Sequence, residues 1–95
     1  MGVRENKVEK RITKGVEKLG GFTEKWGTLS NPDMVIFCHS IVDFLEVKTV
    51  NGVKSTGQTR RIKKMQDHGA NAFFIKGHKE ADEYLVELEK RINKC

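Results

Sequence analysis

The sequence has little proline or cysteine and no long apolar segment. Pro32 is the only proline, and Cys38 and Cys95 are the only cysteines. Two cysteines do not make a disulfide framework, and a free thiol within an apolar segment packs as a small hydrophobe. A reducing, cytoplasmic compartment is therefore expected. No apolar run approaches the length of a membrane span, and the charged segment 1–10 does not have the pattern of a secretory signal.

The composition predicts one soluble globular domain over residues 1–95. Hydrophobic residues make up 37% of the chain and charged residues 33%, which is ordinary for a folded domain. Lysine and arginine number 18 against 13 aspartates and glutamates, giving a formal charge of +5 and a pI near 9.4. A domain pI above about 9 is typical of nucleic-acid binding, although many basic proteins bind no nucleic acid.

Hydrophobic periodicity predicts an α/β domain in the order helix, three strands, helix, strand, helix. The first helix carries an apolar stripe of Val8, Ile12, Val16 and Leu19, and Gly20-Gly21 should end it. The expected elements are a helix at 5–19, strands at 22–26, 34–38 and 41–48, a helix at 57–68 capped by Ser55 or Thr56, a strand at 72–76 and a helix at 79–93. We expect a loop at 27–32, a turn at 77–78, a central or buried last strand, and at least one parallel strand pair.

A short acidic and basic pattern lies at the end of the third expected strand. Alternate side chains of a strand share a face, so Glu46 and Lys48 point the same way and Val47 points into apolar packing. Between Asp33 and Glu46 there is room for one strand, a tight turn at 39–40 and the start of a second strand. Such a hairpin would bring Asp33 beside Glu46. Two carboxylates and an ammonium group suit divalent-metal chemistry on a phosphodiester, with Mg²⁺ as a typical oxygen-liganded ion.

Each of these residues also has an ordinary structural explanation. Glu46 and Lys48 could form a solvated strand face, and Asp33 could be a turn residue after Pro32. Glu5 lies on the apolar stripe of the first helix, either beyond the edge of the core or facing a shared polar site. Gln58 lies on the stripe of the second helix with Ile62 and Met65.

The second helix also carries a basic ridge. Its residues are Arg60, Arg61, Lys63 and Lys64. Such a ridge could follow the phosphates of a nucleic acid, which supply most of the sequence-independent affinity, or it could be a solvated helix face.

The order and spacing of these residues resemble the virus-type replication-repair nuclease (VRR_NUC) domains. This family is a branch of the restriction-endonuclease-like superfamily with the PD-(D/E)xK motif. The matching elements, in chain order, are Glu5, Gly20-Gly21, Lys25, Pro32-Asp33, Glu46-Val47-Lys48 and Gln58. Ser30 stands where the family usually has a glycine, and Glu9 is a rival to Glu5 for the helix carboxylate.

The resemblance implies a restriction-endonuclease-like core, with a mixed central sheet flanked by helices, and a metal-dependent phosphodiesterase. Asp33, Glu46 and the Val47 carbonyl would bind Mg²⁺ or Mn²⁺, and Glu5 would bind the metal directly, through water or at a second metal site. Lys48 would position or activate the attacking water and stabilise developing charge. Gln58 would orient Lys48 or that water. Lys25 and the basic ridge would contact DNA.

Small members of the family resemble homodimeric resolvases of branched DNA such as Holliday junctions. The resemblance therefore implies a homodimeric structure-specific endonuclease for DNA repair. We expect a phage or prophage source, in which case the protein would act in the cytosol of the bacterial host. The main alternative is a non-catalytic, basic nucleic-acid-binding α/β module. A zinc site is the weaker alternative, because its candidate ligands lack paired spacing; these are Cys38, His39, His68, His78 and Cys95.

Overall fold

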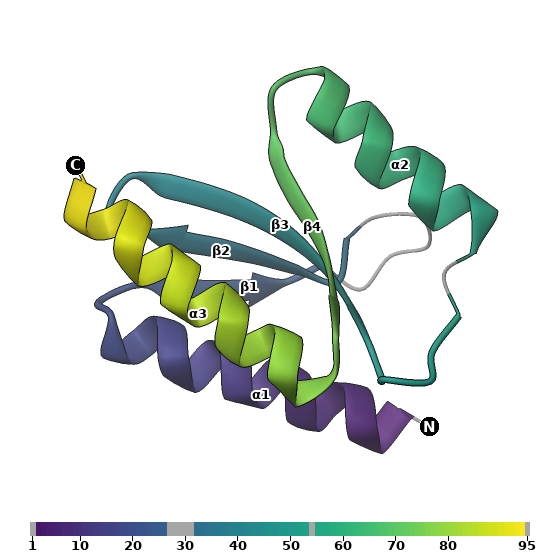
Figure 1. Cartoon of the computed structure of the whole chain (residues 1–95), viewed down its shortest axis with the longest axis horizontal. Helices are drawn as coiled ribbons and strands as arrows, with labels where there is room; N and C mark the ends of the chain where they lie inside the picture. Colours follow the sequence, from purple (N-terminus) through teal and green to yellow (C-terminus); the bar gives the residue numbers. More distant parts are fainter. Residues whose placement is uncertain (1, 27–31, 54, 95) are drawn as a thin grey trace.

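The computed structural model describes residues 2–26, 32–53 and 55–94, with side chains from residue 7 onward. The elements are α1 (Gly2–Lys18), β1 (Phe22–Lys25), β2 (Met34–Cys38), β3 (Ile41–Lys48), α2 (Thr56–Asp67), β4 (Asn71–Lys76) and α3 (Gly77–Lys94). This order confirms the predicted α-β-β-β-α-β-α architecture (Figure 1). The loop expected at 27–32 lies, except for Pro32, outside the described residues, as does Ser30.

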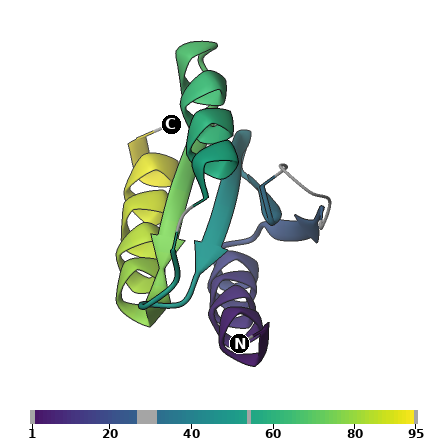
Figure 2. The same ribbon diagram turned by 90° about the vertical axis from the view of Figure 1, so that its right-hand side faces the viewer.

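The four strands form one mixed sheet in the order β1-β2-β3-β4. β1 pairs antiparallel with β2 and β2 antiparallel with β3, whereas β3 pairs parallel with β4. The parallel pair confirms the predicted crossover through α2. Helices α1 and α3 lie side by side along the sheet, and α2 lies apart from them near β4 (Figures 1 and 2). In the part of the chain that the structure describes, no helix is long and apolar enough to cross a membrane.

The predicted apolar stripe of α1 packs into the core. Val8, Ile12 and Val16 are buried, and Leu19 packs against the same cluster. After Lys18, the Gly21 N–H donates to the Val16 carbonyl and the Gly20 N–H to that of Glu17, each at 3.0 Å. With Gly20 at a φ of 93°, this is the glycine-ended helix terminus that the Gly-Gly pair predicted.

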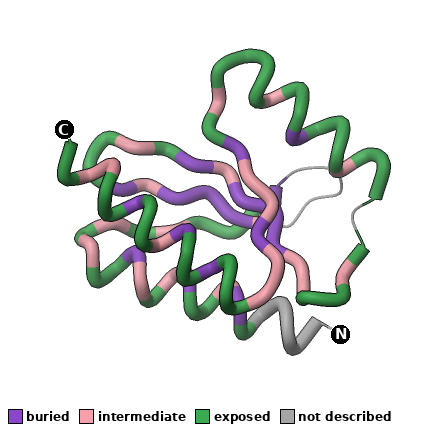
Figure 3. The backbone as a smooth tube through the Cα atoms, viewed as in Figure 1, coloured by how far each residue is buried: buried purple, intermediate pink, exposed green. Residues whose placement is uncertain are grey.

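The core lies between the sheet and the α1–α3 pair. Its strand residues come from alternate positions, including Met34 and Ile36 on β2 and Leu45 and Val47 on β3. Helix α3 contributes Ala81, Tyr84 and Leu88, and its side chains approach α1 so closely that a Cβ on Gly15 would lie 2.4 Å from Leu85 Cδ1. The buried segments concentrate on β2, β3 and the inward sides of these helices (Figure 3).

The β2–β3 hairpin turns at His39-Ser40, as predicted. Both residues have positive φ, 49° and 69°, which matches the twist that two-residue hairpin turns require. His39 Nε2 lies 2.7 Å from the Leu19 carbonyl, so the turn is held to the end of α1. The resulting register pairs Met34 with Leu45.

The last strand was expected to be central or buried; it is an edge strand that is partly buried. Ala72 and Ile75 are buried, because α2 and α3 both pack against β4. Two side chains bond to its backbone: Gln66 Nε2 donates to the Ala72 carbonyl and the Lys76 N–H donates to Glu80 Oε1, both at 2.7 Å. Such contacts protect a sheet edge from pairing with another strand.

The turn expected at Gly77-His78 is instead the start of α3. Gly77 has a φ of 74°, a left-handed conformation that lets the chain pass directly from β4 into the helix.

The face of β1, β2 and β3 that points away from α1 and α3 carries aromatic residues. Phe22 stacks on Phe37 with ring centroids 5.0 Å apart, and Trp26 contacts Phe44 at 5.5 Å. Phe22 is 55% exposed and Trp26 45% exposed. This surface, called here the aromatic face, consists of Phe22, Trp26, Phe37, Val42 and Phe44.

Candidate active site

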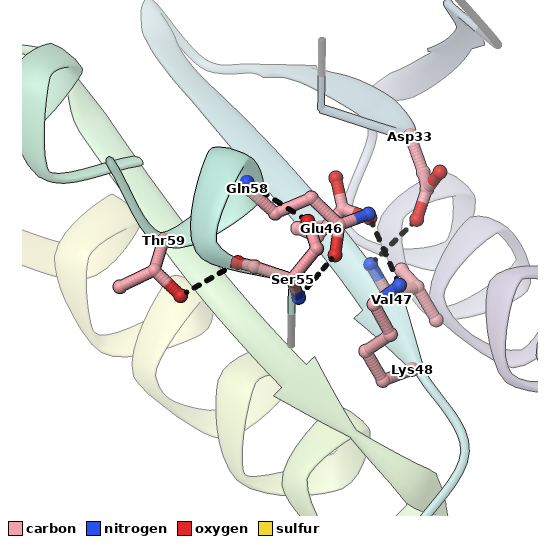
Figure 4. A network of polar contacts seen from close by, with 7 residues as sticks. All are labelled: Asp33, Glu46, Val47, Lys48, Ser55, Gln58 and Thr59. Atoms are coloured by element: carbon pink, nitrogen blue, oxygen red, sulfur yellow. Dashed lines mark hydrogen bonds and ion pairs between the residues drawn. The ribbon is translucent and has the colours of Figure 1, made fainter. Parts of the chain in front are cut away.

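Asp33 lies beside the end of β3, where the hairpin was expected to bring it. Met34 pairs with Leu45, so Asp33 stands one step further along, opposite Glu46. Asp33 Oδ2 accepts a hydrogen bond of 2.8 Å from the Val47 N–H (Figure 4). The Asp33 carboxylate is thereby fixed to the backbone of the strand that carries Glu46.

Helix α2 contributes an amide to the Glu46 carboxylate. Gln58 Nε2 donates to Glu46 Oε2 at 2.7 Å. The contact explains the polar residue on the stripe of α2. Gln58 was expected to orient Lys48 or the attacking water, and its hydrogen bond runs to Glu46, the neighbour of Lys48.

A capping box orients Gln58. The Gln58 N–H donates to Ser55 Oγ at 3.1 Å, and the Ser55 N–H donates to Gln58 Oε1 at 3.2 Å (Figure 4). One end of the Gln58 amide therefore caps the helix while the other end holds Glu46. Sequence reasoning proposed Ser55 only as a simple cap; the Ser-x-x-Gln spacing signals the full motif.

Lys48 lies on the same side of β3 as Glu46. Its Nζ is 3.7 Å from Glu46 Oε2, and only 14% of its side chain is exposed. Val47 points the other way and is fully buried in the core, as alternation along the strand predicted.

The environment of Glu46 disfavours its negative charge. Glu46 is 3% exposed, and burial, followed by the nearby Asp33 carboxylate, raises the pKa of Glu46 to about 7 against the opposing effect of Lys48. Two close carboxylates in a buried position repel each other. A cation between them would relieve that repulsion.

These features fit a hard divalent cation. Asp33 and Glu46 supply carboxylate oxygens, the donors that Mg²⁺ and Mn²⁺ prefer. Among the residues whose side chains are described, no group of three or more His, Cys, Asp or Glu is arranged to hold a metal ion. The side chain of Glu5, the third expected acid, lies outside the described residues.

The remaining predicted residues lie on other elements. Lys25 Nζ is 3.2 Å from Glu9 Oε1, so the rival acid of α1 forms an ion pair with β1. The four residues of the basic ridge on α2 are exposed, and Lys63 pairs with Asp67 at 3.6 Å.

A buried polar cluster on β3 was not anticipated. Asp43 is fully buried; it accepts a hydrogen bond of 2.6 Å from the Tyr84 hydroxyl and ion-pairs with Arg91. Asp43 shares the face of Leu45 and Val47, which points into the core. An acid at an inward strand position, with an arginine seven residues after a tyrosine on α3, is the signal that could have revealed it.

Comparison with known proteins finds similarity in structure. No protein-family model matches the sequence, and no curated protein gives a significant match. A solved structure described as a VRR_NUC domain superposes with a TM-score of 0.78 and 29% identity, covering 88% of this chain and 95% of that one. The resemblance predicted from the motif order is therefore confirmed, as is the restriction-endonuclease-like fold.

A second solved structure supports the fold alone. It is the Holliday junction resolvase Hjc of Archaeoglobus fulgidus, an archaeal hyperthermophile, with a TM-score of 0.59 and 17% identity. The alignment covers 76% of this chain and 62% of the resolvase chain.

Proposed function

We propose that this chain, which has the restriction-endonuclease-like fold of a VRR_NUC domain, is a single-domain, metal-dependent nuclease that hydrolyses phosphodiester bonds in DNA. The observation that carries the proposal is the convergence of three segments on one buried carboxylate. Asp33 precedes β2, Lys48 lies on β3 and Gln58 lies on α2, and all three face Glu46. A purely structural role does not require a buried acid whose nearest neighbours include a second acid.

Asp33 and Glu46 are the proposed ligands of Mg²⁺ or Mn²⁺, with the Val47 carbonyl and Glu5 as further candidates. When bound, the cation would polarise the phosphoryl oxygen and make a bound water easier to deprotonate. Gln58 and the Val47 N–H hold the two carboxylates in place.

Lys48 is the proposed group that acts on the reacting atoms. Its ammonium lies in a largely buried position 3.7 Å from Glu46 Oε2. There it can orient the attacking water and offset the charge that develops on the phosphate. Buried donors fixed in advance stabilise such charge more effectively than mobile ones in water.

The preferred substrate of the proposed nuclease is branched DNA, cut by a homodimer. The similarity to the archaeal resolvase supports this choice, and a two-fold dimer would present two equivalent sites to a substrate with two-fold symmetry. Lys25 and the exposed basic ridge of α2 are the proposed phosphate contacts. The proposed location is cytoplasmic, as in the bacterial host of a phage.

A cleavage panel tests the proposal. Labelled four-way junction, flap, duplex and single-stranded DNA are incubated with Mn²⁺, Mg²⁺ or EDTA. We expect cleavage only with the divalent metals and its loss in Glu46→Gln and Lys48→Ala. Glu89→Gln is the matched control, because Glu89 is an exposed acid on α3, and it should cleave normally.

Three results would contradict parts of the proposal. Binding of DNA without cleavage by the wild-type protein would identify a non-catalytic nucleic-acid-binding module. Cleavage in EDTA would show that the reaction needs no divalent metal. A monomer in light scattering at the concentrations used for cleavage would contradict the proposed homodimer.

A further inference from the structure

Two aromatic residues flank the candidate site. Phe74 stands opposite Glu46 on β4 but is half-buried, whereas Trp26, on the other side, is 45% exposed. The Trp26 N–H donates to the Asp33 carbonyl at 3.0 Å, which extends the β1–β2 ladder one step beyond the Lys25–Met34 pair. Trp26, Asp33 and Glu46 therefore stand in one row across three neighbouring segments. Because directly opposed residues of antiparallel strands project to the same face, the Trp26 ring lies on the side of the sheet where the two carboxylates lie.

Phe44 continues this row toward the aromatic face. It precedes Glu46 by two positions on β3, so both side chains share a face. Its ring contacts that of Trp26, with centroids 5.5 Å apart and planes inclined by 58°. Phe44 is half-buried, whereas 45% of Trp26 is exposed. Phe44 thus supports a tryptophan that keeps a large accessible surface.

The dimensions of the row match those of a nucleotide. Neighbouring strands are about 4.8 Å apart, so the Trp26 backbone lies two spacings, roughly 10 Å, from that of Glu46, with Asp33 between them. If a cation at these carboxylates holds a phosphate, the base of that nucleotide or of the next one would therefore lie near Trp26. A paired base is stacked inside a duplex and cannot offer its face to a side chain, whereas an unpaired base can.

The charges around the site also suit a nucleic-acid strand. The candidate site lies between the aromatic face on β1–β3 and helix α2, which carries the exposed Arg60, Lys63 and Lys64. Proteins that bind single strands combine cations for the backbone with aromatic rings for the bases.

We propose that Trp26, supported by Phe44, stacks on an unpaired base next to the phosphate that a cation bound by Asp33 and Glu46 would hold. This inference rests on the proposed function and adds a basis for substrate choice. DNA with unpaired or splayed bases beside the cleaved bond is preferred over continuous duplex, because only the former supplies a base for the ring.

The experiment uses the fact that Trp26 is the only tryptophan in the chain. Its fluorescence is recorded with Mg²⁺ and the Lys48→Ala protein, which keeps the proposed metal ligands but should not cleave, while single-stranded DNA, a duplex with one unpaired base, or a fully paired duplex is added. We expect strong quenching with the first two DNAs and weak quenching with the third. The reciprocal measurement places the fluorescent base 2-aminopurine at the unpaired position, and its emission should also be quenched when it stacks on Trp26.

Affinity measurements on labelled DNA complete the test. Alanine substitution of a base-stacking aromatic weakens binding by roughly 5- to 150-fold. We expect a loss in this range for Trp26→Ala on DNA with unpaired bases and a much smaller loss on paired duplex. Trp26→Phe should retain most of the affinity, which shows that the fold survives the substitution.

Phe22→Ala is the matched control. Phe22 is a ring of similar exposure on the same face, 55% exposed against 45% for Trp26, but it lies four residues, about 13 Å, further from the site. It should leave affinity for every DNA within about twofold, a change smaller than that expected for one lost stacking contact.

Several outcomes would overturn the inference. One is equal loss of affinity from Trp26→Ala and Phe22→Ala, and another is equal quenching by paired and unpaired DNA. A third is tryptophan emission that changes with protein concentration but not with DNA, because this would mean that a second copy of the chain covers the aromatic face. Cleavage by the wild-type protein without quenching refutes only the stacking role, whereas quenching without cleavage refutes only the nuclease.

Discussion

Replacing Glu46 by glutamine should remove a pH-dependent part of the protein's stability. Burial and the neighbouring Asp33 raise the pKa of Glu46 from an ordinary 4.5 to about 7. Each pKa unit corresponds to about 1.4 kcal/mol, so the full difference amounts to about 3 kcal/mol. Between Glu46 and Gln58, the 2.7 Å hydrogen bond can persist in the variant, because glutamine keeps an acceptor oxygen.

The sign of the effect follows from proton linkage. A carboxyl group with a raised pKa in the folded state binds its proton more tightly there than in the unfolded chain. In the absence of metal, this stabilisation is complete below about pH 4.5 and is lost as the pH rises through about 7. The metal-free wild-type protein should therefore be less stable at pH 8 than at pH 5.

Urea unfolding in EDTA at a series of pH values measures the effect. The free energy of unfolding of the wild-type protein should fall by about 3 kcal/mol relative to Glu46→Gln between pH 4.5 and 8. Manganese should restore more stability at pH 8 than at pH 5, since it competes with the proton for the same carboxylates. Parallel pH profiles for the two proteins would refute the argument that Glu46 lies in a charge-disfavouring site.

Two further predictions concern packing and the buried ion pair. Gly15→Ala should destabilise the protein by about 1–2 kcal/mol, because its Cβ would lie 2.4 Å from Leu85 Cδ1, and overpacking outweighs the better helix propensity of alanine. Gly57→Ala, where a Cβ meets nothing within 4 Å, should instead be neutral or stabilising, and thermal melts of the two variants measure the difference. Arg91→Ala should lower the urea-unfolding free energy by about 3 kcal/mol, because it leaves the carboxylate of Asp43 buried without its cation. A loss below about 1 kcal/mol would show that solvent reaches this carboxylate.

The hairpin and its consequence for the site could be predicted from the sequence. The two-residue turn at 39–40 fixes the register, because a shift of one residue would turn the apolar side chains of β2 and β3 away from the core. Once the register is fixed, Asp33 must stand opposite Glu46. The positions of both acids therefore depend on local pattern, which a single sequence contains.

Other features depend on contacts that local pattern does not encode. The apolar composition of β4 is the same for a central strand and for an edge strand covered by helices on both faces, so the sequence could not decide between the two. The partner of Gln58 is set by where α2 crosses the sheet. Asp43 and Arg91 are 48 positions apart, and only the packing of α3 brings them together.

The hydrogen bonds on the backbone of β4 also limit how copies of the chain can associate. A strand added beside β4 would have to displace Gln66 from the Ala72 carbonyl and Glu80 from the Lys76 N–H. The sheet is thus closed to edge-to-edge growth at this side. Copies that meet on this side of the molecule must therefore use the surfaces of α2 and α3 and not the edge of β4, which leaves β1 as the sheet edge available for strand pairing.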